Sequence, residues 1–285
     1  MKKNSKTLII SLLSITSLIC FGFFNLPKNN YDPAYVKIDT QDYKGAKLTT
    51  IMMTRSGDRI KAKFFATNDE QGKSVYSRFI EWSKGKNIIL LSNPCYHTDY
   101  NGQMIPNGFC MDNGKLVNKE ISDRGSALVI VYATGGIAVS NLKEKNYNIT
   151  CDNKSYNLID SWDKKEFISC AEKQSASVFQ QHLLVYRNQL SDFTGISDSK
   201  RERRFLAIGK DANGVLKHII IDYPSGATLA DGAEKVFNLL KENYQMQDIT
   251  FMINMECGSG NVFNLYDKLG NFRNDIKGTV DPKEN

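Results

Sequence analysis

The sequence lacks the short motifs that usually mark a metal or nucleotide site. No Cys-x-x-Cys or His-Glu-x-x-His occurs, and the three histidines, His97, His182 and His218, lie far apart in the chain. A zinc site is therefore not expected. The stretch Gly258-Ser-Gly260 has neither the lysine of a P-loop nor the third glycine of the dinucleotide fingerprint. We expect neither a metal nor a cofactor.

The chain also lacks a strong excess of charge. Its formal net charge is +6, and Lys2, Lys3 and Lys6 supply three of these charges, which leaves +3 (6 − 3) for the rest. This excess is too weak to predict a nucleic-acid partner. The sequence contains no internal repeat and no low-complexity tract. With 285 residues, 41% of them hydrophobic, it is long enough to bury a sizeable core.

Residues 1–24 have the pattern of an export segment. Three lysines precede an uncharged apolar stretch from Thr7 to Phe24, which predicts that the chain leaves the cytoplasm. No Ala-x-Ala site follows, and the stretch is just long enough to span a bilayer. A cleaved signal peptide and a retained membrane anchor therefore both remain open, with the periplasm or the envelope membrane as the location. Ser17-Leu-Ile-Cys20 only weakly resembles a lipoprotein site, because Ile19 is large.

Five cysteines lie beyond the export segment, and an oxidising compartment predicts disulfides among them. Because five is an odd number, at least one thiol is left over or pairs outside the chain. Cys151 with Cys170 is the first choice, since both flank one polar stretch, Asp152 to Ser169. The five are Cys95, Cys110, Cys151, Cys170 and Cys257.

The apolar runs predict an α+β fold built on a mostly antiparallel sheet, with helices inserted between hairpins. Residues 25–45 are expected to form a linker or a first strand, and 46–285 a single domain. Val236, Phe237 and Leu240 should pack on the sheet, because their spacing gives one apolar helical stripe. The expected hairpins are Lys47–Thr54 with Arg59–Ala66, Ala127–Ala133 with Ile137–Ser140, and Phe205–Gly209 with Val215–Asp222. The expected helices are Ser74–Lys84 and 228–244, and the further strands are Asn87–Ser92 and Ile249–Met255.

The most informative stretch is Phe251 to Phe263, where an apolar strand ends in polar residues and opens into a glycine-rich loop. Asn254 and Glu256 would stand on a rigid strand end, which is how many active sites are built. A strand followed by an ordinary glycine turn explains the same pattern. Asp222 also ends a strand and is most simply a turn residue. His218, within an apolar strand, is most simply a packed side chain.

Four segments together resemble the phosphodiester glycosidase domain family, the bacterial relatives of the enzyme that uncovers mannose 6-phosphate. The family's Asn-Gly-Gly-Phe-Phe, Pro-x-Gly-Leu, Arg-Thr-Ala-Ile-Gly and Asn-Leu-Asp-Gly-Gly-Gly-Ser motifs occur in the same order. The matching stretches are Leu91-Ser-Asn93-Pro-Cys-Tyr96, Pro106-Asn-Gly108-Phe109, Arg204-Phe-Leu-Ala-Ile-Gly209 and Ile253-Asn-Met-Glu256-Cys-Gly-Ser259. Glu256 stands where the family has Asp, and Pro94 and Cys95 replace glycines of the first motif.

The resemblance implies a hydrolase that cleaves the glycosidic side of a sugar-1-phosphodiester in an envelope or host glycan. Glu256 would supply the carboxylate near the sugar carbon, with Asp222 as a second acid–base group. The implied partner is a glycan or sugar phosphate, and a membrane if the N-terminal segment is retained. The implied substrate-binding residues are Asn93, Tyr96, Asn107, Gly108, Asn254 and Ser259 for the sugar side, and Arg204 or Lys210 for the phosphate.

A second hypothesis is a catalytically silent sugar-binding or envelope-assembly module of the same fold, which the replaced glycines favour. Two expectations bear on the choice. Asn93 and Glu256 should converge within about 10 Å on neighbouring strand ends, because remote polar strand ends make one site only if the sheet joins them. Cys95 and Cys257 should form a disulfide if their Cα atoms lie within about 7 Å.

Overall fold

The computed structural model describes residues 11–13, 18–23, 34–56, 59–66, 72–100, 103–194, 199–258 and 261–281. Most of the predicted export segment lies outside these ranges, as does Ser259. Within that segment, β1 (Ser11–Leu13) and β2 (Leu18–Phe23) pair with β5 (Ile60–Phe65). None of the helices in the described ranges is both long enough and apolar enough to cross a bilayer.

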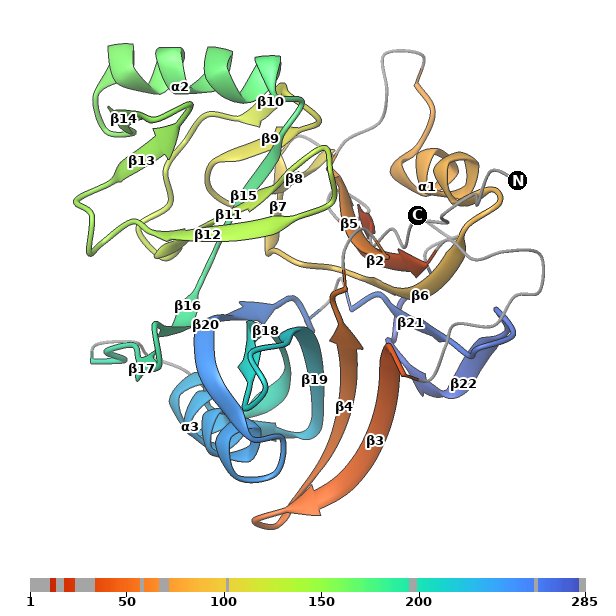
Figure 1. The fold of residues 1–285 in the computed structure, drawn as a ribbon. Helices are drawn as coiled ribbons and strands as arrows, with labels where there is room; N and C mark the ends of the chain where they lie inside the picture. The colour runs from red at the N-terminus through yellow and green to blue at the C-terminus, as the bar shows by residue number, and fades with distance from the viewer. Residues whose placement is uncertain are drawn as a thin grey trace.

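A seven-stranded antiparallel sheet forms the lower half of Figure 1. Its order is β17 (Gln189–Leu190), β16 (Leu183–Tyr186), β20 (Met246–Met255), β18 (Arg201–Asp211), β19 (Leu216–Ala227), β4 (Ala46–Thr54) and β3 (Val36–Tyr43). Helix α3 (Leu229–Glu242) covers one face of this sheet. The hydroxyl of Thr228 caps α3 by accepting a hydrogen bond from the Asp231 N–H at 3.1 Å. The predicted helix is confirmed, with Val236 and Leu240 fully buried and Phe237 packed partly buried against the same cluster.

Two of the three predicted hairpins are confirmed, and one is wrong. β18 pairs with β19, and β11 (Ala127–Val131) pairs with β12 (Ile137–Asn141). The first predicted hairpin does not form, because β4 and β5 lie in different sheets. Both edges of β4 are already occupied, by β3 and β19, so β5 has no free edge to pair with.

The second sheet has six strands, in the order β1, β5, β2, β6 (Asn87–Ser92), β21 (Phe263–Tyr266) and β22 (Phe272–Lys277). Its β1–β5 pair is parallel, and its other pairs are antiparallel. Helix α1 (Val75–Ser83) begins after its cap, Ser74, and buries Val75 and Phe79. The predicted strand at Asn87–Ser92 and the predicted first helix are both confirmed.

The third sheet has five strands, in the order β10 (Lys115–Asn118), β9 (Cys110–Asp112), β15 (Ser177–Gln181), β11 and β12. Helix α2 (Ser161–Lys173), at the top of Figure 1, lies beside the hairpin of β13 (Asn148–Cys151) and β14 (Lys154–Asn157). The Cys151–Cys170 disulfide joins that hairpin to α2, as predicted. The α2 helix was not expected, because few of its residues are apolar; Phe167, Cys170 and Ala171 form its buried side.

The largest core cluster lies between the sheets and includes residues of all three, among them Ile51, Phe64 and Phe179. The rings of Phe64 and Phe179 stack with centroids 5.0 Å apart. The chain passes from the five-stranded to the seven-stranded sheet at His182, directly between β15 and β16. The architecture is therefore α+β with mostly antiparallel sheets, and the crossing at His182 is where polar side chains gather.

Candidate active site

A cavity of about 730 Å³ lies where the five-stranded and seven-stranded sheets meet. Its wall includes the crossing segment Gln180 to His182, the start of β18, the end of β20 and the base of the hairpin formed by β7 (His97–Tyr100) and β8 (Gln103–Pro106). The lining residues are Tyr96, His97, Asn107, Ser122, Asp123, Arg124, Gly125, Lys143, Gln180, Gln181, His182, Thr194, Arg201, Arg203, Leu229 and Glu256.

Glu256 is the predicted carboxylate that faces this cavity. It follows the last residue of β20 and is only 6% exposed. Burial raises the pKa of its carboxyl group, although hydrogen bonds from the Gly258 and Cys257 N–H groups and the charge of Arg201 act in the opposite direction. The Gly258 N–H donates to Glu256 Oε1. A carboxyl group with a raised pKa, fixed at the end of a buried strand, is suited to exchanging a proton with a bound ligand.

Tyr96 lies beside Glu256 in the cavity wall. Asn254 Nδ2 donates to the Tyr96 hydroxyl oxygen at 2.6 Å and to the Met255 carbonyl at 2.9 Å. Burial and the neighbouring Glu256 charge raise the pKa of Tyr96, so its hydroxyl stays protonated at neutral pH. Because Asn254 occupies the oxygen as a donor, the hydroxyl proton remains able to donate a hydrogen bond. The Tyr96 ring also meets the His182 ring edge-on, with centroids 5.8 Å apart.

Arg201 and Arg203 bring positive charge to the same cavity, and neither was singled out from the sequence. Arg203 is 3% exposed and donates to the Ala227 carbonyl at 3.0 Å and the Ser199 carbonyl at 3.1 Å. The charges of both arginines oppose the rise in the pKa of Tyr96, and the charge of Arg201 also opposes the rise in that of Glu256. The cationic lining residues are Arg124, Lys143, Arg201 and Arg203, against the acidic Asp123 and Glu256. This excess of positive charge favours an anionic ligand.

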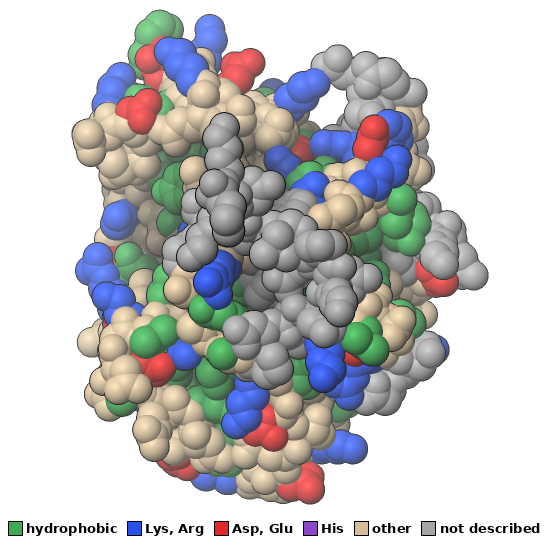
Figure 2. Space-filling model, turned by 45° about the vertical axis from the view of Figure 1, so that its right-hand side comes forward, with side chains coloured by type: hydrophobic (Ala, Val, Ile, Leu, Met, Phe, Trp, Pro, Cys, Tyr) green, Lys and Arg blue, Asp and Glu red, His purple; other side chains and the backbone are tan. Residues whose placement is uncertain are grey.

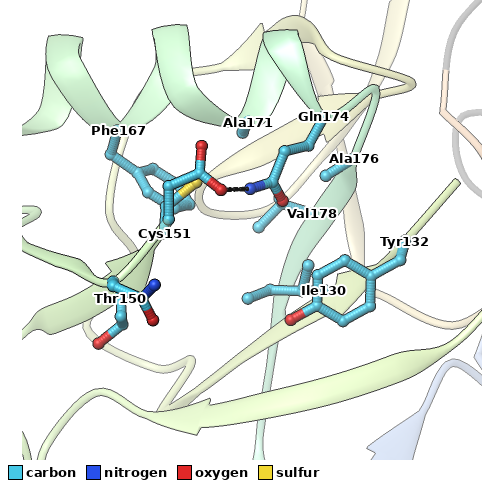
Figure 3. Close-up of a pocket in the computed structure, with 11 residues that line it drawn as sticks. Ile130, Tyr132, Thr150, Cys151, Phe167, Ala171, Gln174, Ala176 and Val178 are labelled. Atoms are coloured by element: carbon cyan, nitrogen blue, oxygen red, sulfur yellow. Dashed lines mark hydrogen bonds between the residues drawn. The ribbon is translucent and has the colours of Figure 1, made fainter.

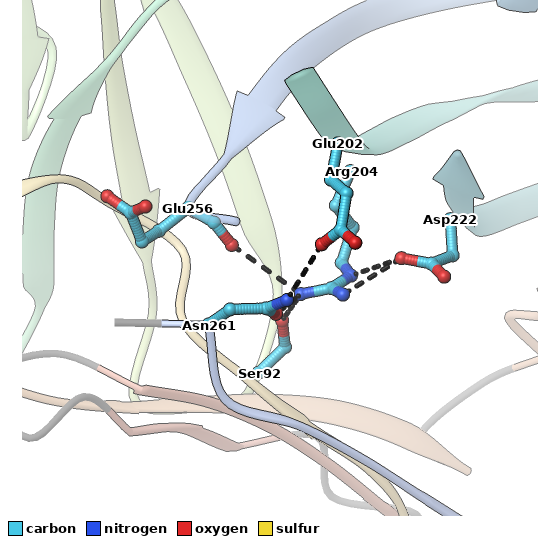
Figure 4. A network of polar contacts seen from close by, with 6 residues as sticks. All are labelled: Ser92, Glu202, Arg204, Asp222, Glu256 and Asn261. Carbon is cyan, nitrogen blue, oxygen red and sulfur yellow. Dashed lines mark hydrogen bonds and ion pairs between the residues drawn. The ribbon is translucent and has the colours of Figure 1, made fainter. Parts of the chain in front are cut away.

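Arg204 and Asp222 lie behind the cavity wall rather than in its lining. Arg204 is 2% exposed and bonds to Asp222, to Asn261 at 3.0 Å and to the Glu256 carbonyl at 3.5 Å. Figure 4 shows the Glu256 carbonyl directed toward Arg204 and its carboxylate directed away. Consecutive strand residues point to opposite faces, which separates Arg204 from Arg203. The guanidinium of Arg204 is thus enclosed by protein groups and braces the strand ends.

The remaining predicted site residues are dispersed. Asn107 is exposed and lines the cavity, and Gly108 has φ +81° and lies against the Gln180 side chain. Asn93 is fully buried and does not line the cavity. Lys210 is exposed six residues beyond Arg204 along β18, which corresponds to roughly 20 Å.

The strand ends that carry Asn93 and Glu256 do meet. Arg204 Nη1 lies 3.5 Å from Ser92 Oγ, at the end of β6, and 3.5 Å from the Glu256 carbonyl, after the end of β20. The Asn93 N–H donates to the Val262 carbonyl at 3.2 Å, which ties the same strand end to the segment that follows the Glu256 loop. The backbones therefore converge, while only the Glu256 side chain lines the cavity.

The predicted Cys95–Cys257 disulfide is not formed, since both residues carry thiols. Burial raises the pKa of Cys257 to about 12, although the Arg204 charge acts to lower it. Such a thiol is a poor nucleophile at neutral pH. Cys95 is fully buried and does not line the cavity, whereas its neighbour His97 does. Burial lowers the pKa of His97, so that its imidazole is neutral at pH 7.

A second, smaller cavity of about 330 Å³ lies beside the Cys151–Cys170 disulfide (Figure 3). Its wall combines apolar and polar side chains, and at one side the Asp152 carboxylate accepts a hydrogen bond from Gln174 Nε2 at 2.5 Å. Asp152 lies close to both cysteine sulfurs, but these are bonded to each other and offer no thiolate to a metal ion. None of the predicted site residues lines this cavity.

Charge on the surface is mixed. On the face shown in Figure 2, Lys and Arg side chains are spread among Asp and Glu side chains rather than gathered into one patch.

Comparison with known proteins gives distant structural likenesses only. No protein-family model and no curated protein sequence matches the chain. The structure is similar to the catalytic domain of zebrafish N-acetylglucosamine-1-phosphodiester alpha-N-acetylglucosaminidase, auto-inhibited by its pro-peptide, with 14% identity, a TM-score of 0.43 and coverage of 87% of this chain and 77% of that chain. It is also similar to a hypothetical protein from Synechocystis, with 13% identity, a TM-score of 0.41 and coverage of 84% and 58%. These values are too low to assign a family or an activity.

Proposed function

We propose that the protein is an exported hydrolase of the phosphodiester glycosidase type, which cleaves the glycosidic side of a sugar-1-phosphodiester. One observation carries the proposal: Glu256, Tyr96, Arg201 and Arg203 line a single cavity. The cavity volume of about 730 Å³ lies within the range of small-molecule sites and accommodates a sugar phosphate.

The reaction breaks the bond between the sugar carbon C1 and the phosphate oxygen. Positive charge develops at C1 while negative charge grows on the departing phosphate. The Glu256 carboxylate stabilises the first charge and takes a proton from the water whose oxygen bonds to C1. Arg201 and Arg203 stabilise the second charge. A departing phosphate monoester carries the electron pair of the broken bond without needing a proton first, so one well-placed carboxylate suffices.

Tyr96 and Asn254 orient the ligand in this proposal. Asn254 fixes the Tyr96 hydroxyl by its 2.6 Å hydrogen bond, so the phenol proton is presented in a defined direction. A protonated phenol beside Glu256 can donate to a sugar hydroxyl or a phosphate oxygen without competing for the catalytic proton. Asp222 and Arg204 have no contact with the ligand in this arrangement and instead hold the loop that carries Glu256.

The test is an assay of the purified domain against a panel of sugar-1-phosphodiesters, comparing the wild type with Glu256→Gln. Glutamine keeps the shape of the side chain but cannot accept the proton, so turnover should fall by about 100-fold or more. Lys210→Met is the matched control, because Lys210 is exposed and distant along β18. A Glu256→Gln variant with wild-type turnover would remove Glu256 from the mechanism.

The alternative is a catalytically silent sugar-binding module. One observation favours it: Asp222, the expected second acid–base group, does not line the cavity and is bonded to Arg204. In that case the domain binds sugar phosphates without turnover, and Glu256→Gln changes affinity alone. Binding to the panel by calorimetry, measured beside the hydrolysis assay, separates the two functions.

A further inference from the structure

Cys95 and Cys110 stand at the two sides of the β7–β8 hairpin, whose base carries Tyr96 and Asn107 into the large cavity. The Asn107 N–H donates to the Tyr96 carbonyl at 2.8 Å, and His97 pairs with Pro106. Cys95 precedes this paired base by two residues, and Cys110 follows it by four. The hairpin therefore brings two positions that are 15 apart in sequence (110 − 95) toward one another.

Strand β15 holds both cysteines from a second direction. Gln181 Nε2 donates to the Pro94 carbonyl at 2.9 Å, just before Cys95, and Phe179 pairs with Cys110. Both side chains are 0% exposed and belong to the same core cluster. Burial, and next the charge of Cys95, raise the pKa of Cys110.

We propose that Cys95 and Cys110 form a disulfide bond when the chain folds in an oxidising compartment, and that this bond braces the base of the β7–β8 hairpin. The oxidant is a small disulfide such as oxidised glutathione. One cysteine thiolate attacks it, which breaks its S–S bond and releases one glutathione thiolate. The second cysteine then attacks the mixed disulfide and releases the other. Two protons leave the cysteines, and the oxidant becomes two thiols.

The bond forms during folding rather than afterwards. In the folded chain both thiols are buried, and a buried thiol with a raised pKa exchanges slowly, because the thiolate is the reactive form. In the unfolded chain both are accessible. Cys257, partly exposed and next to Glu256, is the thiol that remains.

Mapping of the refolded chain tests this directly. The reduced, denatured protein is refolded with reduced and oxidised glutathione, alkylated in denaturant without reductant, and digested with trypsin. No lysine or arginine lies between Lys86 and Lys115, so Cys95 and Cys110 share one tryptic peptide. We expect that peptide to carry no alkyl group, and its halves to stay joined after cleavage at Met104. Alkylated Cys257 and bonded Cys151–Cys170 are the internal controls.

Two results would overturn the proposal: alkylation of both Cys95 and Cys110 while Cys151–Cys170 is intact, or a Cys95–Cys257 linkage. The bracing is tested with the double variant Cys95→Ser/Cys110→Ser against Cys257→Ser. We expect the thermal midpoint of the double variant to fall by roughly 5–10 °C and amide exchange in residues 96–107 to speed up, with Cys257→Ser unchanged. Equal exchange in all three proteins would show that the hairpin base needs no brace. The wild-type map decides the bond even if the double variant fails to fold.

Discussion

The guanidinium of Arg204 donates two hydrogen bonds to a single carboxylate oxygen of Asp222, at 3.0 Å from Nε and 2.8 Å from Nη2. Its third nitrogen, Nη1, donates to Asn261 Oδ1 at 3.0 Å, and its Cζ lies 3.8 Å from the centroid of the Phe263 ring. One side chain of β18 therefore joins β19 to the segment that follows β20, directly behind the wall that carries Glu256 (Figure 4). Burial acts to lower the pKa of Arg204, but the nearby acidic groups raise it above its ordinary value. The guanidinium therefore keeps its positive charge.

Asp222→Ala should destabilise the protein by about 3 kcal/mol, because it leaves the buried Arg204 charge without its carboxylate. Urea unfolding monitored by circular dichroism measures the change. Glu166→Ala is the control, since it breaks the Lys154–Glu166 pair, whose two side chains are 59% and 42% exposed, and should leave the midpoint nearly unchanged. Equal losses in the two variants would contradict a bracing role for Asp222.

Local sequence patterns predicted many elements but few of their partners. The Thr228 cap and the apolar stripe after it fix α3, and the polar stretch between Cys151 and Cys170 pointed to their disulfide. The partner of β5 could not be predicted, because an apolar strand can pair with any open edge. One edge of β4 is occupied by its neighbour in sequence, β3, and the other by β19, which is distant in sequence. Helix α2 was missed because its buried face consists of a few residues within a charged sequence.

The site was predicted in part for a related reason. Glu256 and Tyr96 could be found because each stands at the end of an apolar strand or in the loop after one. Of the three arginines at the start of β18, the sequence resemblance favoured Arg204. Strand alternation and a register shift between Arg201 and Arg203 place these two toward the cavity instead. The face of β18 that borders the cavity is determined by how the five-stranded and seven-stranded sheets meet. A local sequence pattern cannot predict that arrangement.

Gly108→Ala should weaken both stability and ligand binding. Gly108 has φ +81°, and a Cβ there would lie 2.3 Å from Gln180 Oε1, which accepts hydrogen bonds from the Phe109 and Ser122 N–H groups. The strained backbone costs about 1–3 kcal/mol, and displacement of Gln180 adds to it. Gly270→Ala is the matched control, because its φ is +83° but its Cβ would meet nothing within 4 Å. If both variants lose the same stability in urea, contact with Gln180 has no role.

Leu239→Ala should cost more stability than Phe237→Ala, although the sequence pattern gave prominence to Phe237. Leu239 is 0% exposed on the buried side of α3. Its truncation leaves a cavity and should lower the free energy of unfolding by about 3 kcal/mol. Phe237 is only partly buried, with the Lys241 ammonium 5.7 Å from its ring centroid, and its truncation should cost about 1–2 kcal/mol. Urea midpoints of the two variants test this, and the reverse order would place Phe237 in the core instead.

His218 should make the protein less stable in acid. It is 0% exposed on β19 between Met53 and Ile208, and neither ring nitrogen has a hydrogen-bond partner among the described residues. Burial, and next the charge of Arg55, lower its pKa from 6.5 to about 3. Below pH 6.5, His218 is therefore protonated in the unfolded chain but stays neutral in the folded chain. The contribution of buried, neutral His218 to the free energy of unfolding is fully present above pH 6.5. It is lost progressively as the pH falls toward 3.

Replacing His218 with leucine should remove this dependence. Between pH 7 and pH 5 the wild type should lose about 2 kcal/mol more stability than His218→Leu, since 1.5 pH units below 6.5 correspond to that free energy. Urea unfolding at pH 7, 6 and 5 measures both proteins, and carboxylates that titrate in this range affect them equally. His97→Leu is the control: its imidazole is partly exposed, so its effect on the slope should be smaller. Parallel pH profiles for the wild type and His218→Leu would mean that the folded protein accommodates a protonated His218, through a water or a local opening next to Arg55.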